Sequence, residues 1–314
     1  MMIELVRCLR FELRRLVDPI RALLCIAMIA CAISSGYGTL EQFAMATQST
    51  LGGSVAQDVF YATLNSEWAV GLYLPAAIGA LCIDMVGGDV DGAGREAVFI
   101  RLTHRQAWWV AKVVAIFACS LLVMAATHVL STAYDALVHG MPVSAGAIPT
   151  WLSFTGDMAD IPTASALIMR PVPRSWNILA LDAALIAAYG TAYSVLIILI
   201  EGCLMRVRSR WAAAVAGISI AIGNIALEGV ADIAFSYGAV SVEVRALPIY
   251  RLMLTTYPFG AGFTTDRLFP SDLAGDPFGA TSLYMNSFSS TLLIIVLLAI
   301  GGISIGALHM RKWA

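Results

Sequence analysis

Charged residues are scarce in this chain of 314 residues: they make up 13 % of it, against about 25 % in a typical soluble domain. Hydrophobic residues make up 59 %, and the mean hydropathy is +0.81. A soluble chain of this composition would expose large apolar patches, which soluble monomers avoid. Disorder requires low hydrophobicity and high charge, so it is excluded as well. The composition indicates a membrane protein, and a net charge of −2 gives no indication of a nucleic-acid partner.

Motifs of catalysis and nucleotide binding are also missing. Lysine occurs only as Lys112 and Lys312, and neither lies in the GxxxxGK[ST] loop that holds phosphates in P-loop proteins. HExxH and GxSxG are absent. The six cysteines have no CxxC spacing and none lies in a predicted external loop, so we expect no disulfide and no zinc site. We therefore expect a protein that is not an enzyme and binds no metal or cofactor itself.

Two further candidates for catalysis are weak. His128, near the end of an apolar run, is expected to be a satisfied or interfacial histidine rather than a catalytic base. Asp84 and Asp182 are expected near opposite sides of the bilayer, so they do not form the facing pair of an intramembrane aspartyl protease. Acidic residues at span ends either reach water or line the mouth of a pathway, and both interpretations of Asp182 stay open.

Long apolar segments are what this chain does contain. Because a bilayer span needs about 20 apolar residues, and barrel strands would alternate and be half as long, these segments predict helices. We expect an all-α membrane protein with six transmembrane helices, at about residues 20–38, 68–87, 107–130, 177–200, 211–231 and 289–309.

Lys and Arg residues concentrate in the segments that an N-terminus-inside topology places in the cytoplasm. This topology predicts both termini inside and outer loops at about 39–67, 131–176 and 232–288, around one transmembrane domain over 1–314. The stretch Leu247–Gly262 in the last outer loop is apolar but too short to span, and it either lies on the surface or enters the bilayer. We expect a multi-pass protein of the plasma membrane, and of a bacterium.

Residues 1–18 are expected to form an amphipathic helix on the inner membrane surface. Apolar residues recur at spacings of three and four: Ile3, Val6, Leu9, Leu13, Leu16 and Val17. Three arginines share the opposite face: Arg7, Arg10 and Arg14. Pro19 disfavours helix at Asp18 and should end the segment there. The helix is either an anchor that orients the protein or a docking surface for a cytoplasmic partner.

The predicted inner loop between the second and third spans begins with an acidic, Gly-rich turn at 87–96 and continues into a short apolar and basic piece. Trp108 and Trp109 then indicate a membrane interface. Lys112, just inside the third span, is expected to extend back to the headgroups.

In this loop the chain resembles the permease subunit of ABC-2 type transporters. The residues that match that family's pattern in order are Asp89, Gly92, Glu96, Arg105 and Lys112, although Leu102-Thr103-His104 stands where the family usually has a proline. The resemblance implies a separate ABC ATPase subunit that uses ATP and Mg. It also implies that the ATPase would bind the loop helix through Glu96, Arg101 and Arg105, together with the arginines of the N-terminal helix.

Small residues repeat every four positions in two predicted spans, as Ala213, Gly217 and Ala221 in the fifth, and Gly302 and Gly306 in the sixth. Such repeats allow close helix packing in lipid, either within one subunit or at an interface with a second permease half. The resemblance implies such a half, of the same or a homologous chain. Pro75 interrupts the second span and is expected to kink it.

Two functions follow as expectations. The first is the permease of an ATP-driven exporter that moves a hydrophobic or amphipathic substrate, such as an antibiotic, a peptide or a lipid-like molecule. The second is a non-transporting immunity or sensor protein that binds a ligand through its outer loops. The sequence selects neither the substrate nor the direction of transport.

Overall fold

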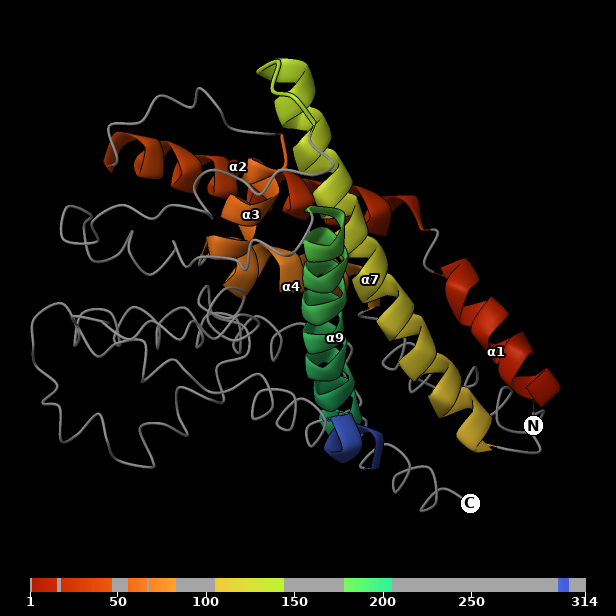
Figure 1. Cartoon of the computed structure of the whole chain (residues 1–314). Helices are drawn as coiled ribbons and strands as arrows, with labels where there is room; N and C mark the ends of the chain where they lie inside the picture. Colours follow the sequence, from red (N-terminus) through yellow and green to blue (C-terminus); the bar gives the residue numbers. More distant parts are fainter. Residues whose placement is uncertain are drawn as a thin grey trace, which may run out of the picture.

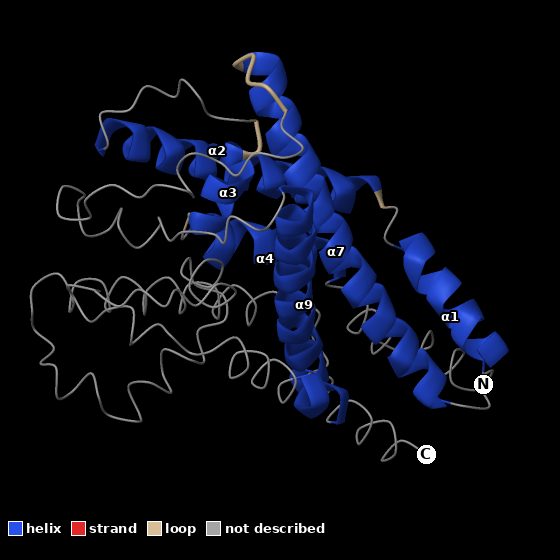
Figure 2. Cartoon of the chain, viewed as in Figure 1, coloured by secondary structure: helices blue, strands red, loops and turns tan. Residues whose placement is uncertain are grey.

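The structure is a computed structural model of the whole chain, and it describes residues 2–15, 18–46, 56–66, 68–82, 105–143, 178–204 and 299–304. All regular secondary structure in these ranges is helical (Figure 2). Three of the described helices contain segments long and apolar enough to cross a membrane: Pro19–Gly38, Gln106–Val138 and Ile178–Ile198. Within the described residues, the expected helical structure and apolar helices of membrane-spanning length are thereby confirmed. The predicted span 211–231 and most of 289–309 lie outside the described residues.

Helices α1 (Met2–Arg15) and α2 (Pro19–Ala46) are separated at Asp18 and Pro19, as the sequence predicts. The side chain of Asp18 caps α2: its Oδ1 accepts a hydrogen bond from the Ile20 amide at 3.0 Å, and its Oδ2 lies 3.4 Å from Arg21 Nε. Pro19 occupies the first helical position, where its missing N–H leaves no unpaired donor.

The segment predicted as an outer loop at 39–67 contains helical structure. Helix α2 continues to Ala46, and α3 (Asp58–Asn65) folds back against it. From Ala56 to Leu64 every side chain of this segment is buried. Gly36 of α2 permits the close approach, because a Cβ there would lie 2.6 Å from the backbone nitrogen of Thr63.

The predicted second span, 68–87, is described to Cys82, and its helix is irregular. It begins as a π-helical turn, η1 (Ala69–Tyr73), and continues as α4 (Leu74–Cys82). Pro75 explains the irregularity, because proline has no amide hydrogen to give to the preceding turn and its ring clashes with a carbonyl there. The predicted interruption at Pro75 therefore takes the form of a π-turn.

Helices α7 (Arg105–Val138) and α9 (Ile178–Leu204) run side by side in opposite directions, while α2 crosses them steeply (Figure 1). Gly190 lets α9 approach Leu121 of α7 closely. With 34 residues, α7 is about 51 Å long, and it continues eight residues beyond the predicted end at 130. It is followed by Gly140, whose φ of +68° is readily adopted only by glycine.

Trp108 and Trp109 are buried within the folded chain rather than exposed to headgroups. Trp109 Nε1 donates a hydrogen bond to the carbonyl of Ile303 at 3.2 Å, which joins the first turns of α7 to the short helical segment 299–304. The start of α7 is thus a packed junction of chain segments that are far apart in sequence.

Candidate functional site

A buried ion pair joins α1 to α7. Lys112 Nζ lies 2.8 Å from Glu12 Oε1, and both side chains are 0 % exposed. The ammonium also lies 4.3 Å from the centre of the Trp108 ring, in the range of a cation–π contact. The expectation that Lys112 extends to the headgroups is wrong, because a carboxylate from the N-terminal helix compensates its charge inside the protein.

This ion pair determines which face of α1 is buried. Glu12 points into the junction, and Cys8 and Leu9 pack against the core beside it. Much of the expected apolar stripe is on the other side and remains exposed, with Ile3 at 72 % and Val6 at 60 %. The structure therefore confirms a helix here, and it is attached to the bundle by the Glu12–Lys112 pair together with Cys8 and Leu9, whereas Ile3 and Val6 of the apolar stripe stay exposed.

The thiol of Cys8 lies at the edge of this junction. Its pKa is raised by burial and then by the nearby carboxylates of Glu12 and Glu4, against the opposing effect of Lys112. Because the thiolate is the reactive form of cysteine, we expect Cys8 to be a poor nucleophile.

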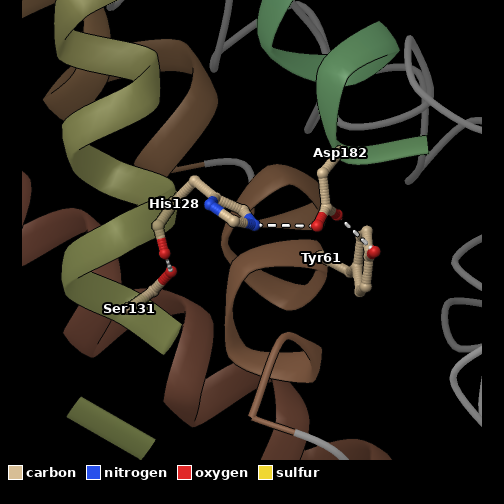
Figure 3. A network of polar contacts seen from close by, with 4 residues as sticks. All are labelled: Tyr61, His128, Ser131 and Asp182. Atoms are coloured by element: carbon tan, nitrogen blue, oxygen red, sulfur yellow. Dashed lines mark hydrogen bonds and ion pairs between the residues drawn. The ribbon is translucent and has the colours of Figure 1, made fainter. Parts of the chain in front are cut away.

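A second polar cluster lies further along α7 and joins three helices. Asp182 of α9 lies between His128 of α7 and Tyr61 of α3 (Figure 3). Its Oδ2 is 2.9 Å from His128 Nε2, and its Oδ1 accepts a hydrogen bond from the Tyr61 hydroxyl at 2.5 Å. Phe60 packs edge-to-face against the imidazole, with ring centres 4.8 Å apart. The expectation that His128 is a satisfied histidine is confirmed.

Tyr61 is a permanent donor in this cluster. Its pKa is raised far above the usual range for tyrosine, first by burial and then by the adjacent Asp182 carboxylate. The phenol therefore stays protonated, and Asp182 accepts from it with one oxygen while the other faces His128. This carboxylate holds α3 and α7 to α9.

Further along α9, two tyrosines donate hydrogen bonds to backbone carbonyls on either side of the break between α3 and α4. Tyr189 donates its hydroxyl hydrogen to the carbonyl of Leu64, in the last turn of α3, at 3.2 Å. Tyr193 donates to the carbonyl of Val70 at 2.9 Å. In a π-turn the partner of that carbonyl would be the amide of residue 75, which is proline and has no hydrogen. Tyr193 thus replaces the hydrogen bond that Pro75 removes.

Substituting Tyr193 with phenylalanine tests this account. The variant leaves the Val70 carbonyl without this donor in a buried position, which costs about 1–3 kcal/mol, so the thermal midpoint of the purified protein should fall. Tyr73→Phe is the matched control, because the Tyr73 side chain is only partly buried and its hydroxyl has no hydrogen-bond partner within the described ranges. Equal midpoints for the two variants would contradict the role of Tyr193.

A third group lies where α7 ends. Tyr37 of α2 stacks on His139, with ring centres 5.0 Å apart, and Tyr134 packs edge-on against both rings. Tyr134 and His139 are exposed. Aromatic residues with a polar tip gather where a membrane meets water, so this group is suited to the boundary at this end of the bundle.

No protein family, curated protein or solved structure matches this chain. Its function is therefore argued from the residues and contacts described above.

The residues predicted to contact an ATPase are only partly placed. Asp89, Gly92, Glu96 and Arg101 lie outside the described residues. Arg105 is the first residue of α7, and three further arginines are exposed on α1: Arg7, Arg10 and Arg14. The predicted loop site thus leads directly into α7, seven residues before the ion pair that attaches α1.

The residues predicted to form a subunit interface are mostly outside the described ranges. This applies to Ala213, Gly217, Ala221 and Gly306. Gly302 is described and lies buried in the helical segment 299–304, next to Ile303, whose carbonyl accepts from Trp109.

The sequence interpretation missed both buried pairs, Glu12–Lys112 and His128–Asp182. It does not single out Glu12, and it considers Asp182 without a partner. The sequence did contain one indication of these pairs. Glu12 and Asp182 are acids in or beside an apolar helix, and His128 and Lys112 are bases within another apolar helix. Ionisable groups in such surroundings usually pair with one another.

Proposed function

We propose that this chain is the permease subunit of an ATP-driven ABC exporter. The observation that carries the proposal is the buried Glu12–Lys112 pair, which fastens the N-terminal amphipathic helix to the start of α7. Helix α7 follows directly on the loop 89–105, where the sequence resembles the ATPase-binding loop of ABC-2 permeases. A force on the loop or on α1 would therefore reach the same apolar helix.

The exposed surface of α1 supports a docking role. Arg7, Arg10 and Arg14 are exposed, whereas Glu12 of the same helix is buried in the ion pair that attaches the helix to α7. A docking element needs charged groups that fix the orientation of the partner and an attachment stiff enough to transmit its movement. Helix α1 has both features.

The proposal assigns ATP binding and hydrolysis, with Mg, to a separate ATPase subunit, and it places a second permease half of the same or a homologous chain opposite this one. The protein would be a multi-pass component of the bacterial plasma membrane with six spans and both termini in the cytoplasm. It would not be an enzyme, and the substrate would be hydrophobic or amphipathic.

Purification of the tagged protein from its native membranes in mild detergent tests the proposal. Mass spectrometry of the co-purifying proteins should identify a P-loop ATPase in stoichiometric amount. An intact, folded protein without such a partner would contradict the proposal.

Charge reversal in the loop gives the second test. Glu96→Lys combined with Arg101→Glu should reduce the co-purified ATPase at least about tenfold, because like charges would face each other at a docked surface. Membrane insertion should be unchanged. Arg174→Glu, in a predicted outer loop, is the matched control. Unchanged co-purification in the loop variant would show that the loop does not bind the ATPase.

A non-transporting immunity or sensor protein is the second candidate. The aromatic group of Tyr37, Tyr134 and His139 favours it, because its two exposed members, Tyr134 and His139, provide a surface for a ligand or partner at one end of the bundle. This candidate requires no ATPase, so the co-purification separates the two functions.

A further inference from the structure

The carboxylate of Asp135 is not used by the coupling function proposed above. Asp135 lies in the last turn of α7 and is only 3 % exposed. Its backbone carbonyl accepts hydrogen bonds from the amides of His139 and Met141. Within the described part of the chain, however, its carboxylate has no hydrogen-bond or ion-pair partner. A buried carboxylate is costly unless another group compensates its charge.

The electrostatics of this helix end favour a cation. The free carbonyls at a helix C-terminus give it a partial negative charge, which basic residues in the last turn normally offset. The last turn of α7 contains no basic residue, and Asp135 adds negative charge there. Glu41 of α2 and Asp135 both interact electrostatically with Tyr37, so a second carboxylate lies nearby. The described residues at this end, 36–46, 56–66 and 129–143, contain no lysine or arginine.

His139 does not neutralise this carboxylate by direct contact. It interacts electrostatically with Asp135, but the described residues form no ion pair between the two side chains. The imidazole stacks on Tyr37 instead, with ring centres 5.0 Å apart. The carboxylate of Asp135 is therefore left for a positive group from outside the described chain.

Aromatic rings lie at the same helix end. Tyr37 and His139 are nearly parallel, at 15°, whereas Tyr134 is inclined at 81° to Tyr37 and at 66° to His139. The ring faces therefore point in two nearly perpendicular directions. Tyr134 and His139 are exposed, so a ligand can reach them. The faces of aromatic rings attract cations, and groups of such rings recognise alkylated ammonium ions.

The turn after α7 holds these groups in place. Gly140, with its φ of +68°, lets the chain reverse, and the amides of His139 and Met141 lie 3.1 and 3.4 Å from the carbonyl oxygen of Asp135. The carbonyl of Pro142 then accepts a hydrogen bond of 3.0 Å from the amide of Ala56. The end of α7 is thus attached to the segment that leads into α3.

We propose that this helix end binds an organic cation through its alkylated ammonium group. Asp135 supplies the opposite charge, and the rings of Tyr37 and Tyr134 contact the alkyl groups. A metal ion fits less well, because the described residues contain no group of three or more His, Cys, Asp or Glu side chains placed to hold one. The site lies 23 residues after Lys112 on α7, about 35 Å along the helix. The proposal therefore does not depend on an ATPase at the other end.

Choline and its uncharged analogue 3,3-dimethylbutan-1-ol test this proposal, because a carbon replaces the nitrogen while the shape is kept. The readout is the Kd of each for the full-length protein in dodecyl maltoside, an uncharged detergent, from saturation-transfer NMR of the methyl signals. We expect choline to bind at least about tenfold more tightly than the analogue. Equal affinities, or no saturable binding of choline, would overturn the proposal.

Variants assign the binding to this site. Asp135→Asn keeps the shape and removes the charge, so the Kd for choline should rise at least about tenfold. Tyr134→Leu removes one exposed ring and should raise it about threefold. Glu4→Gln removes a carboxylate of α1 and should leave the Kd unchanged. An unchanged Kd in Asp135→Asn would refute the site. If that variant does not fold, an unchanged Kd in Tyr134→Leu would refute it instead.

The ammonium group belongs either to a soluble cation or to a phospholipid headgroup, and a further titration separates these sources. Dihexanoylphosphatidylcholine, kept below its micelle concentration, replaces choline in the same NMR measurement. A Kd at least about tenfold lower than that of choline would identify the headgroup, and a similar Kd would identify a soluble cation. In both cases the affinity must fall in Asp135→Asn, and a lipid affinity that this variant leaves unchanged would contradict the proposal.

Discussion

Replacing Glu12 with alanine is expected to lower the free energy of unfolding by about 3–5 kcal/mol. The Lys112 side chain is 0 % exposed. The substitution therefore leaves its ammonium buried with the carboxylate partner removed. Trp108 remains beside it at 4.3 Å, but a ring face offsets much less of the desolvation than a carboxylate does. Reversible denaturation of the purified protein in detergent measures the effect.

A double variant separates the ion pair from simple loss of packing. Glu12→Leu with Lys112→Met removes both charges and keeps apolar volume, and replacing a buried pair in this way is often neutral or stabilising. We expect the double variant to be much more stable than Glu12→Ala. Glu4→Ala, which removes a less buried carboxylate of the same helix, should change stability by less than about 1 kcal/mol. A double variant as unstable as Glu12→Ala would contradict this explanation.

Replacing Gly36 with alanine is expected to have an effect of similar size, about 3 kcal/mol or more, at the upper end of the range for overpacking. The added Cβ would lie 2.5 Å from Thr63 Cα and 2.6 Å from its backbone nitrogen. A side chain can rotate away from such a clash, but the backbone of α3 cannot. Helix α3 would have to move away from α2, and the hydrogen bond between Tyr61 and Asp182 would be strained with it. Thermal unfolding of the purified protein measures the loss.

Gly38→Ala is the control for this substitution. It lies on the same helix two residues later, and a Cβ there has no atom within 4 Å. Alanine favours helix over glycine by about 1 kcal/mol, so this variant should be unchanged or slightly more stable. A loss of stability in Gly38→Ala equal to that in Gly36→Ala would show that glycine flexibility, rather than the approach of α3, is what the site requires.

The two predictions that depend on single polar contacts differ in what they remove. Tyr193→Phe removes one neutral hydrogen bond, and Glu12→Ala removes one partner of a buried charge pair. We therefore expect Glu12→Ala to lose more stability than Tyr193→Phe when both are measured on the same preparation.

The sequence by itself determined the class of this protein and the ends of several helices. Low charge and long apolar runs predict apolar helices, because an exposed backbone is too costly in lipid. The separation at Asp18 and Pro19 and the interruption at Pro75 follow from the covalent structure of proline, which acts on its neighbours wherever the chain folds. These properties are local, so the sequence is sufficient to predict them.

Only the tertiary structure decided which polar groups meet. Glu12 and Lys112 are 100 residues apart, and Tyr61 and Asp182 are 121 apart. Helices α7 and α9 are apolar on nearly every side, so periodicity does not indicate which face packs against which neighbour. The few ionisable residues settle that choice, because each must find its counterpart inside the bundle. This is why Lys112 was expected at the headgroups, and why folding places it against the N-terminal helix instead.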